Sequence, residues 1–536
     1  MKKGIKIFFE NNRWQALFLI LVIAVNVAVS FLISQYTKSF IDTSTNIKDG
    51  RAIAEIFAVI AIIYGILFII DTLISFLAHR LLYSGIKNLR LTMFKKIMET
   101  KFTYFIDNSP GKIWGDIINN TNKASVFYQA LILLPISLIQ AVVYFVIIYR
   151  INTSSALVTL MTLPFIILAT YFFGIKIRKH EAKTMSMYRE MYGDSVEALT
   201  GIKNIKLFNS HGFFYDRFIS KHSSLNKEIV STAVYTQSWQ SFLKVVTNLL
   251  PLIIIVLGVN FVKEFNLGSG DMVILYTFIP LFVSATKDLY SFILSFFGMK
   301  PYMQLINSIL SLEDEDCGNI KELNGFDVQT NGVSYGFKGK TVQIPDISIG
   351  KGEKILITGE SGIGKSTFFN CLTGILQDYG GSIKVSGTEQ KNISLKYLRD
   401  KIILLNQDRI VFDGTVDENL FFGKPYTDVN KVEDIMRIVH LEKFYSDRKD
   451  GKKISKETIS GGEKARLNLA QALLKNPEII LLDEVLSSVD EDMEKEILQS
   501  IIKAYPKLSV VMITHRMSCR DMFDKVYDFH YESTGK

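Results

Sequence analysis

Long apolar runs dominate the first part of the chain, and few charged residues interrupt them. At about 1.5 Å of rise per residue, about 20 helical residues cross the ~30 Å hydrocarbon core of a bilayer. A single run could form a buried core helix, but six in succession predict an all-α six-helix transmembrane domain. The runs lie near residues 14–36, 52–78, 126–149, 154–175, 241–262 and 270–297.

The pattern changes near residue 325, where short apolar strands begin to alternate with turns. Such alternation is typical of an α/β domain. Between the two patterns lies a polar stretch with an acidic run at 313–316, and its composition favours a linker. We therefore expect a transmembrane domain over residues 1–305, a linker over 306–324 and an α/β domain over 325–536.

Lysine and arginine are distributed unevenly around the apolar runs. Residues 1–13 hold four, the segment between the second and third runs holds eight, and the segment between the fourth and fifth holds ten, whereas the other three loops together hold five. Because basic loops face the cytoplasm, both termini and the α/β domain are expected there, in a multi-pass protein of the plasma (inner) membrane. The net charge of +8 then reflects topology, and no nucleic-acid partner is expected.

The two basic segments between runs are long and mostly helix-favouring. At roughly 45 and 65 residues, they predict helical hairpins that project from the membrane. The first apolar run is too long for a signal peptide, so we expect it to stay as a span. The three cysteines show no metal-ligand spacing and are expected to be reduced thiols.

Charged residues inside the apolar runs are candidates for a substrate cavity. Asp71 lies in the second run, and Lys287 and Asp288 lie in the sixth. Charge inside a membrane is costly and usually faces a bundle interior or a wet cavity. Pairing between helices, or snorkelling to the interface, stays open as the alternative.

A glycine-rich loop lies between a predicted buried strand at 354–358 and a predicted helix from 368. It fits G-x-x-x-x-G-K-[ST], the phosphate-binding P-loop. Gly362 and Gly364 let the backbone approach an anion. Lys365 can reach the β- and γ-phosphates, and the Ser366 hydroxyl can ligate Mg²⁺. The nucleotide-binding candidates are Gly359, Glu360, Ser361, Gly362, Ile363, Gly364, Lys365, Ser366 and Thr367.

Two aromatic residues upstream are candidates to stack on the base of the nucleotide. Phe337 is preferred and Tyr335 is the alternative, since both lie on a predicted strand about 30 residues before the P-loop lysine. Either ring could instead face the core of the domain.

Three later strands end in polar residues that fit phosphate chemistry. After a hydrophobic strand, Asp483 can reach the Mg²⁺ shell while Glu484 faces an attacking water. His515 ends another buried strand and can contact the γ-phosphate. Gln407 ends a third strand and can offer its amide oxygen to Mg²⁺ or to water.

A second glycine loop begins a predicted helix near residue 460. Ser460 and the backbone amides of Gly461 and Gly462 form another anion-binding helix N-terminus. One phosphate chain rarely needs two such cradles from one domain. We therefore expect the second loop to bind ATP that another copy holds.

Taken in order, these motifs resemble an ATP-binding cassette, and nearly the whole chain resembles an ABC half-transporter of the exporter type, like multidrug, peptide and lipid exporters. The resemblance implies an all-α six-helix transmembrane domain followed by a P-loop α/β ATP-binding cassette domain. Segments 105–111 and 201–206 resemble the two intracellular coupling regions. The cassette matches are 359–367 for Walker A, Gln407 for the Q-loop, Ser460, Gly461, Gly462 and Glu463 for the signature, Asp483 and Glu484 for Walker B and the catalytic glutamate, 487–490 for the D-loop and His515 for the switch histidine.

The chain departs from the family pattern in three places. Glu463 stands where glutamine is usual, Phe337 replaces the usual stacking tyrosine, and 450–458 lacks the familiar exporter pattern before the signature. The phosphate-facing Ser460 and both glycines are intact, so we do not expect Glu463 to disable the site.

The resemblance also implies a mechanism and partners. Two cassettes, from a second copy or a homologous half-transporter, would close head-to-tail over two ATP molecules with Mg²⁺ and hydrolyse them. Closure would drive export of an amphipathic or hydrophobic peptide, drug or lipid by alternating access. The alternatives are an exporter-fold importer of siderophore type and an ATP-gated channel or regulator. The implied ligands are Ser366, Gln407 and Asp483 for the metal, Glu484, His515 and Gln407 for catalysis, and Ser460, Gly461, Gly462, Glu463 and Asp490 for ATP held in trans.

Overall fold

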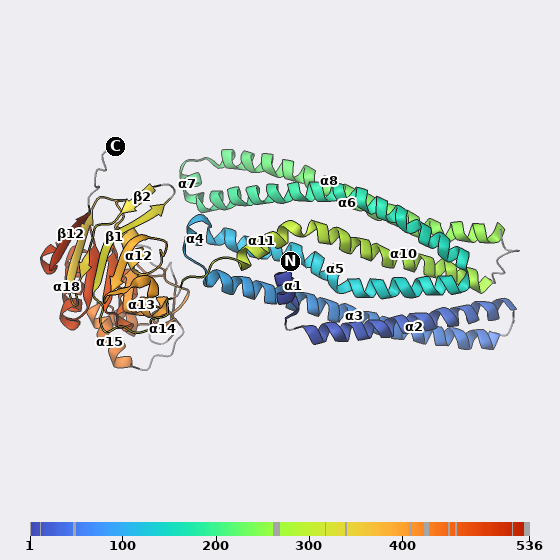
Figure 1. Ribbon diagram of the computed structural model, residues 1–536, viewed down its shortest axis with the longest axis horizontal. Coiled ribbons are helices and arrows are strands. Elements are labelled where there is room, and N and C mark those ends of the chain that lie inside the picture. The colour runs from blue at the N-terminus through green and yellow to red at the C-terminus, as the bar shows by residue number, and fades with distance from the viewer. Residues whose placement is uncertain are drawn as a thin grey trace. The chain divides into compact units, whose positions relative to one another are not determined.

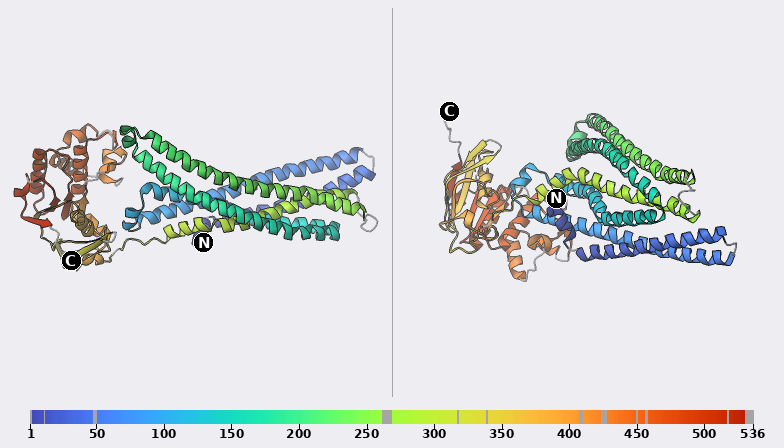
Figure 2. Two further views of the ribbon diagram at one scale, coloured as in Figure 1. Left: turned by 90° about the horizontal axis from the view of Figure 1, so that it is seen from above. Right: turned by 45° about the vertical axis from the view of Figure 1, so that its right-hand side comes forward.

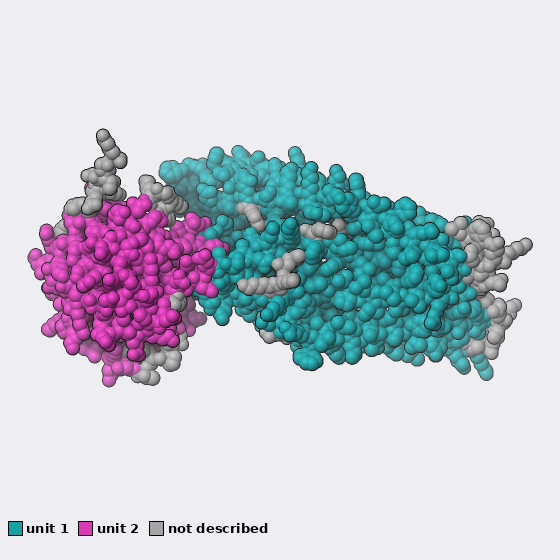
Figure 3. All heavy atoms as spheres, viewed as in Figure 1, with its two compact units in different colours: residues 1–99, 108–312 teal, residues 100–107, 313–536 magenta. Residues whose placement is uncertain are grey.

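The computed structural model contains two compact units (Figure 3). The first consists of Met1–Glu99 and Asn108–Leu312, and the second of Thr100–Asp107 and Glu313–Lys536. The description leaves out residues 1, 11, 47–49, 261–268, 317, 338–339, 407–409, 423–427, 449–450, 456–457, 517 and 530–536.

The first unit is built from helices (Figure 1). In the described part of the chain, five of them are long and apolar enough to cross a membrane: α2, α3, α5, α6 and α10. The predicted run 241–262 forms the second half of α8, and its last two residues lie outside the described part, so that span is only partly tested. The helices are α1 (Lys2–Phe9), α2 (Arg13–Asn46), α3 (Gly50–Met98), α5 (Pro110–Ile151), α6 (Thr153–Thr200), α7 (Ile202–Leu207), α8 (His211–Asn260), α10 (Ser269–Gly298) and α11 (Lys300–Leu310).

Helices α5, α6, α8 and α10 share one apolar core. Its buried residues include Tyr144 and Ile148 of α5 and Phe278 of α10, and the rings of Tyr144 and Phe278 meet edge to face at 5.7 Å. Small buried residues such as Ala141 and Ala156 let the backbones approach closely. The break between α5 and α6 falls at Asn152, whose side chain accepts a hydrogen bond from the Ser155 amide at 2.8 Å and caps α6.

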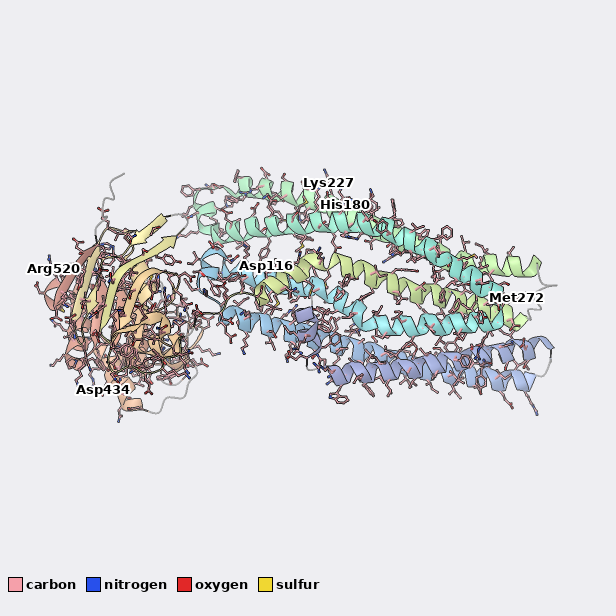
Figure 4. All side chains as sticks on the ribbon, viewed as in Figure 1. Asp116, His180, Lys227, Met272, Asp434 and Arg520 are labelled. Carbon is pink, nitrogen blue, oxygen red and sulfur yellow. The ribbon has the colours of Figure 1, made fainter. Side chains whose placement is uncertain are left out.

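Helices α6 and α8 run side by side as one of the predicted projecting hairpins, as both views of Figure 2 show. The short helix α7 joins them just after Gly201 and contains the segment 202–206. Two polar contacts cross between the two helices: His180 Nδ1 lies 2.7 Å from the Glu228 carboxylate, and the Lys221 ammonium lies 2.6 Å from the Glu190 carboxylate. Figure 4 labels His180 on α6 and, next to Glu228 in sequence, Lys227 on α8.

The second unit is an α/β domain around a five-stranded parallel sheet of order β12-β4-β11-β10-β7. A second, antiparallel sheet has the order β2-β1-β5-β6, with β3 paired to β1, and β8 pairs with β9. The elements are α4 (Thr103–Asp107), β1 (Val328–Phe337), β2 (Lys340–Gln343), β3 (Ser348–Ile349), β4 (Lys354–Gly359), α12 (Lys365–Leu372), β5 (Gly380–Val385), β6 (Thr388–Glu389), η1 (Gln390–Asn392), α13 (Leu395–Lys401), β7 (Ile402–Leu405), β8 (Gly414–Thr415), α14 (Val416–Phe421), α15 (Val429–Ile438), α16 (Glu442–Ser446), β9 (Lys453–Ile454), α17 (Gly461–Leu474), β10 (Ile479–Asp483), α18 (Glu491–Ala504), β11 (Ser509–Ile513), η2 (Arg520–Met522) and β12 (Lys525–Phe529).

Both faces of the parallel sheet are buried, which explains why its strands read as continuous apolar runs. Along β10, Ile480 and Leu482 pack with α14, α15 and α17, whereas Ile479 and Leu481 pack with α12 and the antiparallel sheet. This alternation follows from the two-residue period of a strand. The predicted fold class, an all-α transmembrane region followed by a P-loop α/β domain, is therefore confirmed, but the predicted number of six spans is not: five described helices have the length and hydropathy of a span.

The acidic run of the predicted linker is docked on the second unit. Glu315 receives two hydrogen bonds from Arg399, at 2.7 and 2.9 Å, and Arg399 also donates to the Gly374 carbonyl just beyond α12. The Glu313 carbonyl accepts from the Thr100 hydroxyl at 2.7 Å, and its carboxylate lies 3.0 Å from the Lys101 ammonium. Helix α11 extends to Leu310, so the predicted linker begins as a helix and its acidic run is docked. The three-domain division itself stays a prediction.

Candidate nucleotide site

The P-loop connects β4 to α12, as the sequence predicts. Three of its glycines have left-handed backbone angles, with φ of 136° at Gly359, 84° at Gly362 and 112° at Gly364. A Cβ at Gly359 would lie 2.5 Å from the Phe529 carbonyl oxygen, and one at Gly364 would collide with Val342. The loop therefore needs glycine both for its torsion angles and for its close approach to β12 and β2.

Replacing Gly359 by alanine is expected to lower the unfolding temperature of the purified protein by about 5 °C or more, since the new methyl group meets backbone at an already strained torsion angle. Gly387 is the matched control because its φ is 71° but open space surrounds it. Gly387→Ala should lower the unfolding temperature by less. Equal unfolding temperatures for the two variants would contradict the contact with Phe529.

The P-loop lysine is folded into its own loop. Lys365 is only 7% exposed, and its ammonium donates to the Gly359 carbonyl at 2.7 Å and to the Glu360 carbonyl at 2.8 Å. These two contacts hold the ammonium beside the amides at the start of α12. An ammonium has three donors, so a phosphate placed in the loop can be bound by the same group.

Two proposed metal ligands lie together, one in the first turn of α12 and one at the end of β10. The Ser366 hydroxyl hydrogen-bonds to the Asp483 carboxylate. Burial and, to a lesser extent, the neighbouring Glu484 raise the pKa of Asp483, while Ser366 and the Lys365 charge partly offset that rise. Hydroxyl and carboxylate oxygens are the ligands that Mg²⁺ prefers, so these residues fit the ion. Gln407, the third predicted ligand, lies outside the described residues.

Two of the three predicted catalytic side chains, Glu484 and His515, are in contact. The His515 Nε2 lies 3.1 Å from the Glu484 Oε1, with the histidine 59% and the glutamate 28% exposed. Strand β11 lies between β4 and β10, so the parallel sheet brings both residues to the edge where the P-loop begins. Glu484 has a φ of 50°, and its amide donates to the Ile513 carbonyl at 3.1 Å. Such a torsion angle on a non-glycine residue costs energy and persists only where the surrounding structure holds it.

The second glycine loop begins α17 with a capping box. The Ser460 hydroxyl accepts from the Glu463 amide at 3.2 Å, and the Glu463 carboxylate accepts from the Ser460 amide at 2.8 Å and from its hydroxyl at 2.7 Å. Burial raises the pKa of Glu463, but the two Ser460 contacts and the charges of Arg448 and Arg466 outweigh it and keep the pKa below its ordinary value. Glu463 therefore places a carboxylate on the serine expected to meet phosphate.

The D-loop lies against this second loop. A Cβ built on Gly461 would be 3.5 Å from the Cβ of Ser488, and one on Gly462 would be 3.5 Å from the Ser488 carbonyl oxygen. Asp490, the last predicted trans contact, is exposed and precedes α18. Ser460, Gly461, Gly462, Glu463 and Asp490 are thus grouped on the part of the domain that carries α17 and α18.

The two candidates for base stacking differ in their surroundings. Tyr335 is only 8% exposed and belongs to the core beneath the P-loop helix, and burial raises its pKa. A ring packed in this way cannot also stack on a base. Phe337 ends β1, and its side chain lies outside the described residues. We therefore keep Phe337 as the proposed stacking residue.

The three candidate residues for a substrate cavity have different surroundings. Asp71 on α3 is exposed, and its carboxylate accepts a hydrogen bond from Asn26 of α2 at 2.7 Å. Asp288 is exposed on α10, and the side chain of Lys287 lies outside the described residues. Asp71 thus has an interhelical partner, Asn26, that is neither Lys287 nor Asp288. The role of all three in a cavity stays a prediction.

Sequence reasoning missed Arg516, which follows the switch histidine. Its guanidinium donates to the carbonyls of Ser487 and Val489 at 2.9 and 2.7 Å, and to the Glu494 carboxylate at 2.7 Å. The available signal was weak: a basic residue directly after a predicted strand-end histidine.

Comparisons with known proteins agree with this geometry. The family model described as ABC transporter transmembrane region matches residues 16–286, and the model described as ABC transporter matches residues 342–487. The chain is 25% identical over 452 residues to the lactococcin-G-processing and transport ATP-binding protein of Lactococcus lactis subsp. lactis, covering 82% of this chain and 64% of that relative. It is 25% identical over 502 residues to an uncharacterized ABC transporter ATP-binding protein of Bacillus subtilis, covering 91% and 87%. It is 24% identical over 523 residues to the mesentericin-Y105 transport/processing ATP-binding protein of Leuconostoc mesenteroides, covering 93% and 70%.

A solved structure shares the fold. It is a bacterial Atm1-family ABC exporter with ATP bound, with a TM-score of 0.86 at 18% identity over 97% of this chain and 94% of that one. The membrane-region model covers about half of the chain and the cassette model lies beyond it. The chain therefore belongs to the ABC transporter family, whose cassettes bind ATP and hydrolyse it to drive transport, and it is a multi-pass membrane protein with an exporter-type fold.

Proposed function

We propose that the protein is an ATP-driven exporter that works as a dimer by alternating access. One observation carries this proposal: the P-loop, the Ser366–Asp483 pair and the Glu484–His515 pair meet at one edge of the parallel sheet. ATP would bind in the P-loop, and Ser366, Asp483 and Gln407 would hold the Mg²⁺ that neutralises phosphate charge. Glu484 then orients or deprotonates water while His515 contacts the γ-phosphate. The cassette lies in the cytoplasm, beneath the plasma (inner) membrane.

The second glycine loop supports the dimer. Ser460 and Asp490 belong to the part of the domain that carries α17 and α18, whereas the P-loop begins α12. In the proposed dimer each ATP lies between one P-loop and the partner's Ser460 loop. Closing and opening of the two cassettes then changes the arrangement of the transmembrane helices. Every catalytic position is filled in this chain, so two copies of it are sufficient for a working dimer.

The exported compound is proposed to be amphipathic or hydrophobic. Two relatives are described as processing and transport proteins for lactococcin G and mesentericin Y105. This favours a peptide over a drug or a lipid as the exported compound. The first test is stimulation of ATP hydrolysis in reconstituted vesicles by a panel of amphipathic peptides, drugs and lipids. Directional uptake without ionic conductance would separate this pump from a channel.

Mixed dimers test whether ATP is shared between copies. Lys365→Ala and Ser460→Arg chains should each be inactive alone, but a dimer that pairs them retains one intact shared site and should regain hydrolysis in a single turnover. The control pairs a wild-type chain with a chain that carries both changes; both shared sites are then damaged, so it should be inactive. The opposite result in the two mixtures would show that each copy hydrolyses ATP by itself.

Replacing Glu463 by glutamine is expected to lower the KM for ATP by about twofold to fivefold, because the change removes a negative charge near phosphate and glutamine keeps the capping box. The same change at Glu418 is the control, since Thr415 and Glu418 form another capping box at the start of α14. Steady-state hydrolysis against ATP concentration measures both. A higher KM in Glu463→Gln would contradict the proposed place of this residue.

A further inference from the structure

Arg516 connects three elements that the proposed reaction uses. It directly follows His515 beyond β11, and its guanidinium contacts two carbonyls of the D-loop and one carboxylate of α18. The acceptors are Ser487 at 2.9 Å, Val489 at 2.7 Å and Glu494 at 2.7 Å. One side chain therefore fixes the position of the D-loop relative to the switch strand.

The backbone that Arg516 holds begins at the proposed catalytic base. The Ser487 amide donates to the Glu484 carbonyl at 3.2 Å, and the Val489 amide donates to the Leu486 carbonyl at 2.9 Å. This turn is short, so a shift of the Ser487 carbonyl would move the Glu484 backbone as well. At its other end the turn leads to Asp490, and Ser488 lies beside the second glycine loop.

The chemistry of the contact favours a geometric role over a stabilising one. Glu494 is 1% exposed, and burial raises its pKa while Arg516 partly offsets that rise. A buried ion pair of this kind is usually no more stabilising than a well-packed apolar pair. What the guanidinium adds is a rigid planar fork whose donors lie on separate nitrogens; an ammonium also has three donors, but they diverge from a single nitrogen and cannot reproduce that geometry.

We propose that Arg516 is a positioning residue for ATP hydrolysis: it holds the D-loop so that Glu484 and His515 on one side, and Asp490 on the other, keep the geometry of the closed site. The inference rests on the proposed function, since it assumes that Glu484 acts on water. The contacts of Arg516 are to the D-loop and α18, so no chemical step is assigned to it.

Steady-state hydrolysis by the full-length protein in detergent or vesicles provides the test. Arg516→Lys and Arg516→Gln are expected to lower kcat by about tenfold or more, because small displacements of a reacting group are costly, while KM for ATP changes by less than about threefold. Lysine should fail to rescue the activity. Arg520→Gln is the matched control, since Arg520 is an exposed arginine on the same segment (Figure 4) and should leave kcat unchanged.

A double variant separates positioning from folding. Arg516→Gln alone leaves the Glu494 carboxylate buried without its cation, which is expected to lower the unfolding temperature. Arg516→Gln with Glu494→Gln removes both charges, so the unfolding temperature should recover while kcat stays low. Recovery of kcat together with stability, or wild-type kcat in Arg516→Lys, would overturn the inference and leave the proposed function standing. A wild-type protein without ATP hydrolysis would overturn both.

Discussion

Replacing Glu484 by glutamine is expected to slow ATP hydrolysis by about 100-fold or more while ATP binding is retained. The carboxylate lies 3.1 Å from His515 at the P-loop edge of the sheet, where it can accept a proton from water. Glutamine keeps the shape of the side chain but cannot act as a base, and general-base catalysis contributes about 10²–10⁴-fold to a rate. Because binding uses the P-loop and the metal ligands, the affinity for ATP should change little.

Hydrolysis at saturating ATP and equilibrium binding of labelled ATP, measured on the same preparation, check this result. Glu491→Gln is a suitable control, since it removes an exposed carboxylate at the start of α18, seven positions downstream. Turnover at the wild-type rate in Glu484→Gln would show that another group activates the water. Loss of ATP binding would instead place Glu484 among the binding residues.

Replacing Lys365 by alanine is expected to weaken ATP binding by about 10- to 100-fold and to abolish measurable hydrolysis at ordinary ATP concentrations. A hydrogen bond to a charged group contributes about 1.5–3 kcal/mol, which corresponds to this range of affinity. The change also frees the Gly359 and Glu360 carbonyls from their contact with the ammonium. The empty loop is therefore expected to lose part of its fixed shape.

Equilibrium binding of labelled ATP measures the effect, and an exposed lysine on α13 provides the control. Lys396→Ala removes the same charge from the same unit, outside the P-loop. It should bind ATP as the wild type does. Unchanged affinity in Lys365→Ala would mean that the helix N-terminus and the metal suffice, and the P-loop assignment of the lysine would be wrong.

The sequence allowed much of the nucleotide site to be predicted because its parts are local. The P-loop, the pair Asp483 and Glu484, and His515 each follow directly from a hydrophobic strand. In a parallel sheet the carboxyl ends of such strands meet at one edge. The residues at the predicted strand ends therefore identify the site, even though the order of the strands in the sheet cannot be predicted.

Other features depend on contacts between distant segments and could not be predicted. The burial of Tyr335 depends on helix α12 packing across its strand, and the pairing of Asp71 with Asn26 depends on how α2 lies against α3. The positive φ of Glu484 depends on the turn that follows β10. Arg516 showed no motif at all, because its acceptors are mostly backbone carbonyls, which any sequence supplies.

The docking of the acidic run bears on how fragments of this protein should be cut. A soluble fragment that starts at residue 325, where the α/β pattern begins, would lack Glu315 and leave Arg399 of α13 without its two-point carboxylate partner. Starting upstream of Glu313 restores that pair. Such a fragment would still lack Thr100 and Lys101, so nucleotide affinities measured on it would describe a domain with one of its own pieces removed.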